Sequence, residues 1–294
     1  MLVYIIFKIV VKSYNYMLKF YSRGMNMNQK KKKLNWKKLI VILLLTDLMV
    51  LILISGVNII NWSKDNIKID KQVDDIIINT DVDEVDATDI VSDEANMYFD
   101  YMKMNMIDVN INDLKKINND TKGWIQVSGT NINYPFVQTT DNDYYLTHAF
   151  DKTYNKAGWV FADFRNKING DDKNLILYAH GRVNKTMFGS LKDSLKDSWF
   201  KKKENHLIKT STEHNDSLWQ IFSVYKIPTT NDYIQTDFIS DDEYQNFLNT
   251  LFSRSVHSFD TTISSNDKII TLSTCYNKND KVVIHAKLIG EKQK

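Results

Sequence analysis

The sequence of 294 residues predicts a mainly β domain, a barrel or a sandwich, preceded by one hydrophobic segment near the N-terminus. Two observations lead to this prediction. Eight short apolar or alternating runs follow one another after Gly123, and helical spacing of apolar residues occurs in only a few places. The chain is 43% hydrophobic and 12% aromatic, which supplies a packed core, and only 9 Gly and 2 Pro exclude a collagen-like or low-complexity chain.

The apolar segment from Leu39 to Ile60 predicts a membrane anchor. Its 22 residues span about 33 Å as a helix, enough to cross a bilayer core. Asp47 is its one charged residue and costs about 3 kcal/mol near the centre of a span. The sixteen Leu, Ile and Val residues outweigh that cost. A cleaved signal peptide is the alternative, but the run is too long and lacks a small-x-small cleavage site. We therefore expect residues 39–60 to remain as a transmembrane anchor.

The charge distribution predicts how this anchor is oriented. Residues 1–60 carry a net charge of +9, whereas the rest of the chain carries −7. The basic cluster from Lys30 to Lys38 directly precedes the anchor, so the positive-inside rule places residues 1–38 in the cytoplasm and the C-terminal bulk outside the cell. Because the basic residues belong to this end, we expect no nucleic-acid partner. Translation is expected to start at Met25 or Met27, just before the cluster.

The segment after the anchor predicts a solvated stalk over residues 61–94. Residues 65–94 hold eleven Asp or Glu and two Lys, a block of charge that repels itself. The run from Asp81 to Asp89 is similar to a calcium loop, but it lacks the central Gly and the terminal Glu, so no metal is expected there. Apolar residues at helical spacing from Ala95 to Asn118 predict one or two amphipathic helices at the start of an outer domain of residues 95–294.

Eight runs predict the strands of this outer domain: residues 124–127, 133–138, 158–163, 174–180, 206–211, 218–227, 268–274 and 282–289. Two helices are expected between them. One is marked by apolar residues from Phe188 to Trp199 at helical spacing. The other begins with the capping box formed by Ser240 and Glu243, followed by an apolar face. Core packing accounts for these apolar stripes.

Cys275 is the one cysteine of the chain, so an intrachain disulfide is excluded. It ends the run KIITLSTC, at the C-terminal end of a predicted strand, where a side chain can reach a cleft. A lone cysteine is most often a small buried hydrophobe. Outside the cytoplasm, however, an unpaired thiol is open to oxidation, and a catalytic nucleophile explains its retention better.

A thiol nucleophile needs a base or a cation beside it, and imidazole is the usual choice. The chain offers six histidines: His148, His180, His206, His214, His257 and His285. His180 ends the apolar run NLILYAH and is followed by Gly181, where the backbone can turn sharply and present the ring at a rim. Spacing alone does not choose among the six.

Five segments together resemble a class B sortase, a membrane-anchored cysteine transpeptidase of Gram-positive bacteria. They are TLSTC (271–275), YAHG (178–181), the run from Gly123 to Phe150, KTMFGSL (185–191) and VVIHAKLIG (282–290). The similarity covers residues 107 to 290 in order. It implies an eight-stranded sortase-like β-barrel with N-terminal helices and a helix between the sixth and seventh barrel strands.

The resemblance implies specific roles for two residues. Cys275 resembles the nucleophile that attacks the Thr carbonyl of a C-terminal sorting signal of the NPQTN kind, which forms a thioacyl enzyme. His180 resembles the acid and base that protonates the departing amine and deprotonates the incoming one. The partners implied are surface proteins with a C-terminal sorting signal and a peptidoglycan amine, and no cofactor or metal is implied. The alternatives are a catalytically impaired binding domain and a pilin-polymerising sortase.

The resemblance also implies a peptide groove. Asn142 and Leu146 would line one wall of it, and Ser273 would lie two positions before the nucleophile. The opposing wall would be formed by Thr229, Tyr233 and Ile234.

One position departs from the family pattern. The Arg that sortases place four residues before the last-strand His is Lys281 here, and Lys keeps the charge but loses the planar five-donor fork. Lys281 is therefore expected to stabilise the oxyanion by charge. Arg182, two residues after His180, is a second candidate to supply the guanidinium of the family Arg. The simpler expectation is that Arg182 lies on the surface in solvent.

Overall fold

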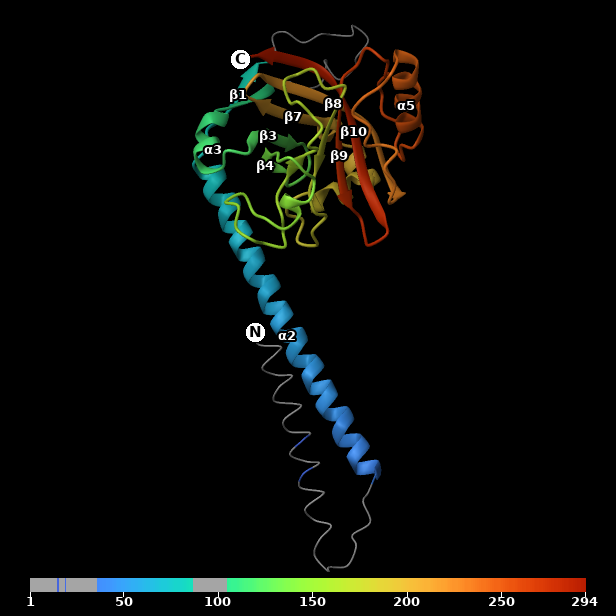
Figure 1. The fold of residues 1–294 in the computed structure, drawn as a ribbon. Helices are drawn as coiled ribbons and strands as arrows, with labels where there is room; N and C mark the ends of the chain where they lie inside the picture. The colour runs from blue at the N-terminus through green and yellow to red at the C-terminus, as the bar shows by residue number, and fades with distance from the viewer. Residues whose placement is uncertain (1–14, 16–18, 20–35, 87–104) are drawn as a thin grey trace, which may run out of the picture. The chain divides into compact units, whose positions relative to one another are not determined.

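The computed structural model describes residues 15, 19, 36–86 and 105–294, and the predicted start at Met25 or Met27 lies outside them. The chain divides into two compact units, residues 1–64 and residues 65–294. Figure 1 shows the long helix α2 and the β-barrel that makes up most of the second unit. Each unit is described by itself.

Helix α2 (Trp36–Ile78) begins in the first unit, where it carries the apolar segment, and its last turns belong to the second unit. No residue of its most hydrophobic stretch is buried, and its mean hydropathy there is 2.8. A core helix of a soluble protein buries its apolar side chains, whereas Leu44 and Ile52 are more than half exposed. The helix is long and apolar enough to cross a membrane, which fits the anchor predicted for residues 39–60.

In the second unit, the last turns of α2 pack into the core, so the prediction of a solvated stalk over residues 61–94 is wrong here. Ile69 is fully buried, Ile76 is 5% exposed, and both belong to the main apolar cluster. They lie with Val73 at intervals of three and four residues, so the helix buries one stripe and leaves most of its charges to solvent. Counting charges alone missed this spacing.

Two short strands follow α2. Strand β1 (Val82–Asp86) pairs antiparallel with β2 (Asn105–Val109), so the residues that are similar to a calcium loop belong in part to a sheet. Because residues 105–109 form strand β2, the prediction of amphipathic helices over residues 95–118 is wrong for this segment. The described part of that range is residues 105–118, and within it only α3 (Ile111–Ile117) is helical. Asn110 caps this helix, because its side chain accepts a hydrogen bond from Asn112 N. The apolar residues of β2 and α3 together fit helical spacing, so the spacing did not reveal the boundary between the strand and the helix.

Eight strands form the closed barrel, and each predicted run overlaps with one of them. They are β3 (Thr121–Val127), β4 (Asn133–Val137), β5 (Phe161–Ala162), β6 (Asn174–Tyr178), β7 (Leu207–Thr212), β8 (Asn215–Pro228), β9 (Ile269–Cys275) and β10 (Asp280–Gln293). Their order around the barrel is β10-β8-β7-β3-β4-β5-β6-β9. The mainly β fold and the eight-stranded barrel are therefore confirmed. The neighbours β6 and β9 are parallel, and β9 and β10 are antiparallel.

The two predicted helical regions are also present. Helix α5 (Asp241–Ser253) starts after Ser240, whose Oγ accepts from Glu243 N at 3.1 Å, and it lies outside the barrel between β8 and β9 in sequence (Figure 1). The region from Phe188 to Trp199 forms the 3₁₀ helix η3 (Gly189–Leu195) and the short α4 (Asp197–Phe200). Shorter 3₁₀ turns are η2 (Tyr144–Leu146) and η4 (Lys203–His206).

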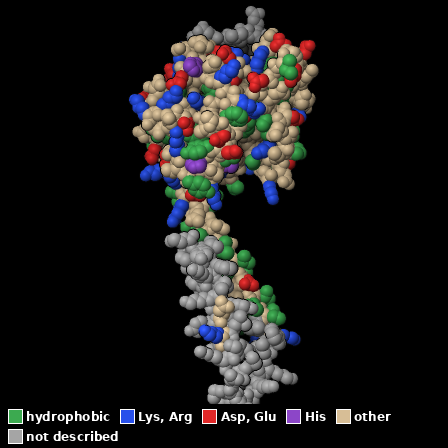
Figure 2. Space-filling model, in the orientation of Figure 1, with side chains coloured by type: hydrophobic (Ala, Val, Ile, Leu, Met, Phe, Trp, Pro, Cys, Tyr) green, Lys and Arg blue, Asp and Glu red, His purple; other side chains and the backbone are tan. Residues whose placement is uncertain are grey.

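Charges on the barrel unit are mixed. Figure 2 shows basic and acidic side chains interspersed over the face in view. Among the described residues of that face, the basic side chains do not gather into a single patch of the kind that binds nucleic acid.

Candidate functional site

Cys275 ends β9 with its side chain on the outer face of the barrel. Ile270 and Leu272 pack in the barrel core, so the alternate residues Ser273 and Cys275 point to the other side. Every earlier residue of β9 is buried, whereas Cys275 is partly exposed. The thiol is thus accessible at a strand end, where the sequence predicted it.

Lys281 lies directly opposite Cys275 in the antiparallel ladder between β9 and β10. Its Nζ is 3.1 Å from the Cys275 Sγ. Paired residues in a ladder share one face of the sheet, and the short YNKND loop between the two strands sets this register. The structure therefore brings a thiol and an ammonium group into contact at this strand end.

His180 reaches the same end of the barrel from β6. Tyr178 pairs with Ser273 in the parallel ladder of β6 and β9, so the residues two positions later, His180 and Cys275, lie at matching levels. A Cβ added to Gly181 would lie only 2.0 Å from the Cys275 carbonyl oxygen. The backbone beside His180 therefore runs against the backbone of the nucleophile, and only glycine fits there.

One nitrogen of the His180 ring is already engaged. Nε2 lies 2.8 Å from the carbonyl oxygen of Leu146, and because a carbonyl only accepts, this nitrogen carries the proton. Nδ1 is then the nitrogen that can exchange a proton with a substrate. Leu146, predicted as a groove residue, is half-buried, and its carbonyl orients the imidazole through this hydrogen bond.

Ser273 and Tyr233 join each other beside the thiol. The Tyr233 hydroxyl lies 3.0 Å from Ser273 Oγ, and both side chains are buried. Burial raises the pKa of Tyr233, while the charge of Lys281 lowers it and that of Cys275 raises it. These two predicted groove residues are thus within electrostatic reach of the reactive pair.

Asn142 and Ile234 are joined by an ion pair that the sequence did not reveal. Asn142 Nδ2 donates to Asp163 Oδ2 at 3.1 Å, and Arg165 Nη2 donates to the Ile234 carbonyl at 2.8 Å. Arg165 in turn holds Asp163 through Nε and Nη2 at 2.8 and 2.7 Å. The two proposed walls of the groove are therefore tied together by one bidentate pair.

Tyr178 also binds the carboxylate of this ion pair. Its hydroxyl donates to Asp163 Oδ2 at 2.9 Å. Burial opposes ionisation of Asp163, but the hydrogen bonds from Arg165 and Tyr178 hold its pKa below the ordinary value. Alternation along β6 places Tyr178 on the same face as His180, which was a usable signal, whereas nothing local marked Asp163 or Arg165.

Thr229 directly follows β8 and is exposed. Its N and Oγ both donate to the Asn279 carbonyl, at 2.9 and 3.0 Å. Asn279 belongs to the loop that joins Cys275 to Lys281, so Thr229 supports that loop in this structure.

Three of the other histidines lie in the core. His285 is fully buried between Thr271 and Tyr225, and burial lowers its pKa to about 3. The rings of His206 and His257 are buried and hydrogen-bonded to the carbonyls of Phe200 and Ser194. The fold therefore separates His180 from these core histidines, which composition could not do.

Arg182 does not supply the guanidinium that was considered for the thiol. Its Nη2 donates to Asn66 Oδ1 on α2, and the side chain is half-buried. Lys281 is the cation that the structure places on the sulfur.

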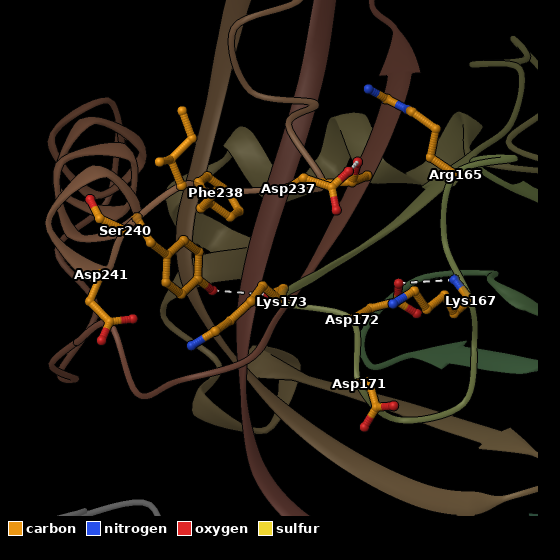
Figure 3. A pocket seen from close by; sticks show the side chains of 12 residues that line it. Arg165, Lys167, Asp171, Asp172, Lys173, Asp237, Phe238, Ser240 and Asp241 are labelled. Atoms are coloured by element: carbon orange, nitrogen blue, oxygen red, sulfur yellow. Dashed lines mark hydrogen bonds between the residues drawn. The ribbon is translucent and has the colours of Figure 1, made fainter.

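A separate pocket of about 420 Å³ lies between residues 165–173 and residues 236–244. Figure 3 shows Lys167, Asp172 and Lys173 on one side of it and Phe238 and Ser240, at the start of α5, on the other. None of the nine predicted site residues lines this pocket, so the candidate site is the open strand end and not this cavity.

Comparisons with known proteins point to the same part of the chain. A family profile described as the sortase domain matches residues 125–289. Sortase B of Staphylococcus aureus is 40% identical over 180 residues, which cover 60% of this chain and 73% of that protein. Sortase B of Listeria monocytogenes is 33% identical over 183 residues, which cover 61% of this chain and 74% of that protein.

Solved structures agree with these matches. Sortase B from B. anthracis in complex with AAEK1 superposes with a TM-score of 0.62 at 31% identity, over 79% of this chain and 99% of that one. A Staphylococcus aureus sortase B-substrate complex superposes with a TM-score of 0.58 at 38% identity, over 61% and 84%. All nine predicted site residues lie within the matched residues 125–289.

Proposed function

This chain belongs to the sortase family and is a cysteine transpeptidase of the sortase B type, and on that premise we propose that Cys275, His180 and Lys281 form its catalytic site. The observation that carries the proposal is the 3.1 Å contact between Lys281 Nζ and Cys275 Sγ at a strand end that His180 also reaches. Nucleophile, cation and proton carrier are thus supplied by three neighbouring strands.

In the first half-reaction, the Cys275 thiolate attacks the carbonyl carbon of a Thr in the substrate. The S–C bond forms, the carbonyl oxygen gains negative charge, and the C–N bond to the next residue then breaks. Protonated His180 gives its Nδ1 proton to the departing amine, while Nε2 remains bonded to the Leu146 carbonyl. The products are a thioacyl enzyme and a released C-terminal peptide.

In the second half-reaction, an incoming amine attacks the thioester carbonyl. Neutral His180 accepts a proton from that amine, a new amide bond forms, and the Cys275 thiolate leaves. One amide bond has been exchanged for another, so no oxidant, reductant or metal enters the balance. Lys281 stabilises the thiolate at the start and at the end of the cycle.

Lys281 also takes the oxyanion role in this proposal. An ammonium group within hydrogen-bond reach of the sulfur is close to the carbonyl carbon that the sulfur attacks, so its charge favours the developing oxyanion. A single ammonium cannot make the two parallel hydrogen bonds of a guanidinium, so we expect stabilisation by charge with less geometric control than Arg gives.

We propose proteins with a C-terminal sorting signal of the NPQTN kind as substrates. The substrate-bound relative supports this class. Leu146, Ser273 and Tyr233 lie around the reactive pair and would line the groove nearest the scissile bond. Asn142 and Ile234, joined through Asp163 and Arg165, would line its outer part, and Thr229 would close the opposing wall.

The acceptor and the location follow from the same proposal. A peptidoglycan amine would resolve the thioacyl enzyme outside the cell. The basic residues before α2 favour a cytoplasmic N-terminus, with residues 39–60 crossing the membrane once and the barrel on the outer side. An anchored enzyme also gains effective concentration toward substrates held at the same surface.

The direct test is capture of the covalent intermediate. The full chain in detergent is mixed with an NPQTN peptide and examined by mass spectrometry, with and without triglycine as a model amine. We expect an adduct on Cys275 with the mass of the peptide up to its Thr, absent in Cys275→Ala, and its disappearance when the amine is added. An accessible Cys275 that acquires no adduct from any sorting peptide would support the non-catalytic binding domain instead.

Neither alternative function is favoured by the observations. A binding domain has no need for a partly exposed cysteine whose sulfur contacts an ammonium group. Pilin polymerisation would use a Lys of another protein as the amine, but the named relatives are sortase B enzymes.

A further inference from the structure

The loop that follows His180 is held in a strained shape. The His180 carbonyl accepts from both Arg182 N and Phe188 N at 3.1 Å, and Gly181 forms a bridge with Met187. Lys185 and Met187 have φ values of 63° and 51°, a left-handed conformation that costs a non-glycine residue about 1 kcal/mol or more. Such a loop keeps its shape only when its surroundings fix it.

The fixing contact comes from α2. Arg182 Nη2 donates to Asn66 Oδ1, and Asn184 Nδ2 lies 3.5 Å from the same oxygen. Asn66 is 8% exposed, so this hydrogen bond is largely removed from water. A hydrogen bond to a charged, half-buried donor is among the stronger kinds.

The same helix face also balances the charge of Arg182. Burial lowers the pKa of Arg182, and the nearby carboxylates of Asp70 and Asp65 raise it. Asn66 and Asp70 are four residues apart and share a helix face, and Ile69 between them is fully buried in the core. The helix is therefore a fixed support for the guanidinium.

Helix α2 also holds the second segment that touches the imidazole. Asn155 Nδ2 donates to the Asp65 carbonyl at 3.2 Å, and Asn155 N donates to the Thr147 carbonyl at 2.9 Å. Thr147 follows Leu146, whose carbonyl binds His180 Nε2. The helix turn from Asp65 to Asp70 is thus connected to His180 from both sides.

We propose that Asn66 and Arg182 are positioning residues for His180, so that the barrel-side turn of α2 sets the imidazole against the nucleophile. The inference rests on the proposed function, because it assumes that His180 carries the proton. Neither residue needs to touch the substrate. A displacement of about 1 Å in a catalytic group can cost about 10²-fold in rate, so the loss of this contact affects turnover more than binding.

The test is a double-mutant cycle on the full chain in detergent. We expect Asn66→Ala and Arg182→Ala each to lower kcat on a quenched NPQTN peptide about 10- to 100-fold with KM unchanged. The double variant should be no slower than the slower single variant, because both remove one contact. Asn66→Asp keeps an acceptor oxygen and should regain most of the wild-type kcat.

The matched control is Asn79→Ala. Asn79 lies at the end of the same helix and is exposed, and its side chain donates to the Asp75 carbonyl in its own helix. Its kcat should equal that of the wild type. Thermal unfolding of each variant checks that the protein is folded, and if Asn66→Ala does not fold, Arg182→Lys is used, for which a tenfold lower kcat is expected.

Three results would overturn the proposal: additive losses in the double variant, an Asn66→Asp variant as slow as Asn66→Ala, or wild-type kcat in folded Asn66→Ala or Arg182→Lys. Cys275→Ala is assayed in parallel. If it still turns over peptide, the proposed function fails. If it is inactive while folded Asn66→Ala is at the wild-type rate, only the positioning role fails.

Discussion

Two cross-strand pairs on the outer face of β9 and β10 differ sharply in environment. Lys281 lies opposite Cys275, and His285 lies opposite Thr271, four residues further along the same ladder. His285 is fully buried and has hydrogen-bond partners at 2.9 Å and 2.8 Å on its two ring nitrogens. The Cys275 pair is partly exposed, and its cation faces the sulfur.

The cover over the sheet produces this difference. Helix α5 and the segment before it pack against Val283 and Tyr225, and the rings of Phe222 and Tyr233 lie around His285. The cover reaches Ser273 through the Tyr233 hydroxyl, and Cys275, two residues later, is partly exposed. One ladder thus supplies a structural histidine under the cover and a reactive pair beyond it, so exposure to solvent decides which role a polar pair takes.

The largest effect on turnover is expected when His180 and His285 are each replaced by Ala in separate variants. His180→Ala should lower turnover of a quenched sorting peptide by at least about 10³-fold, because the departing amine loses its proton donor. His285→Ala should leave kcat per folded molecule unchanged. Equal losses of kcat in the two folded variants would show that the comparison assigns the roles wrongly.

Lys281 should rank next. Lys281→Ala is expected to lower kcat/KM by about 10² to 10³-fold, the usual loss for an oxyanion donor, and Lys281→Arg should keep or raise the rate. The rate at which a methanethiosulfonate reagent forms a mixed disulfide with Cys275, releasing methanesulfinate, reports separately on the reactivity of the thiol. An unchanged rate in Lys281→Ala would move the oxyanion role to another group.

The buried histidine should instead control stability toward acid. The pKa of His285 is about 3 in the folded chain against an ordinary value of 6.5, so between these values the unfolded chain binds the proton and the folded chain does not. Its contribution to stability is therefore complete above about pH 6.5 and is lost as the pH falls toward 3.

Urea unfolding of the wild type and of His285→Gln at pH 7, 5 and 4 measures this contribution. The difference in unfolding free energy between the two proteins should become smaller on acidification, since Gln does not titrate. Taking the difference cancels the acid sensitivity of carboxylates such as Asp163. A difference that is constant with pH would contradict the neutral, buried state of His285.

The smallest effect on catalysis is expected from removing the hydrogen bond between Tyr233 and Ser273, at the edge of the cover formed by α5 and the segment before it. Tyr233→Phe removes the hydroxyl that meets Ser273, a neutral hydrogen bond with a net contribution of about 1 kcal/mol. We expect a change of about fivefold or less in KM for the sorting peptide and little change in kcat. Ser273→Ala should have a similar effect, and a larger loss in kcat for either variant would place this pair in the chemistry itself.

Local hydrophobic runs explain why the reactive end was predictable. The run KIITLSTC placed Cys275 at the C-terminal end of a strand, and the run NLILYAH placed His180 at the end of another. The role of Lys281 came from the resemblance, and the ladder register places this residue opposite Cys275. These features depend on residues close together in sequence, where local periodicity is a reliable guide.

Contacts between distant segments were not predictable in this way. The link from Asn142 to Ile234 runs through Asp163 and Arg165, and neither Asp163 nor Arg165 carries a local signal in the sequence. The stalk prediction failed for the same reason, because the charge of residues 65–78 hid an apolar stripe that becomes visible only against the barrel core. Arg182, expected in solvent, is held by Asn66.

By itself the sequence determined the mainly β fold, the apolar anchor segment and the strand ends that carry Cys275 and His180, because side-chain periodicity and hydrophobic length are local properties. Only the tertiary structure decided which histidine is buried and neutral, which cation reaches the sulfur, and which helix supports the His180 loop. Those outcomes depend on closure of the barrel and on contacts between distant segments, such as the one between Asn66 and Arg182, which are 116 positions apart.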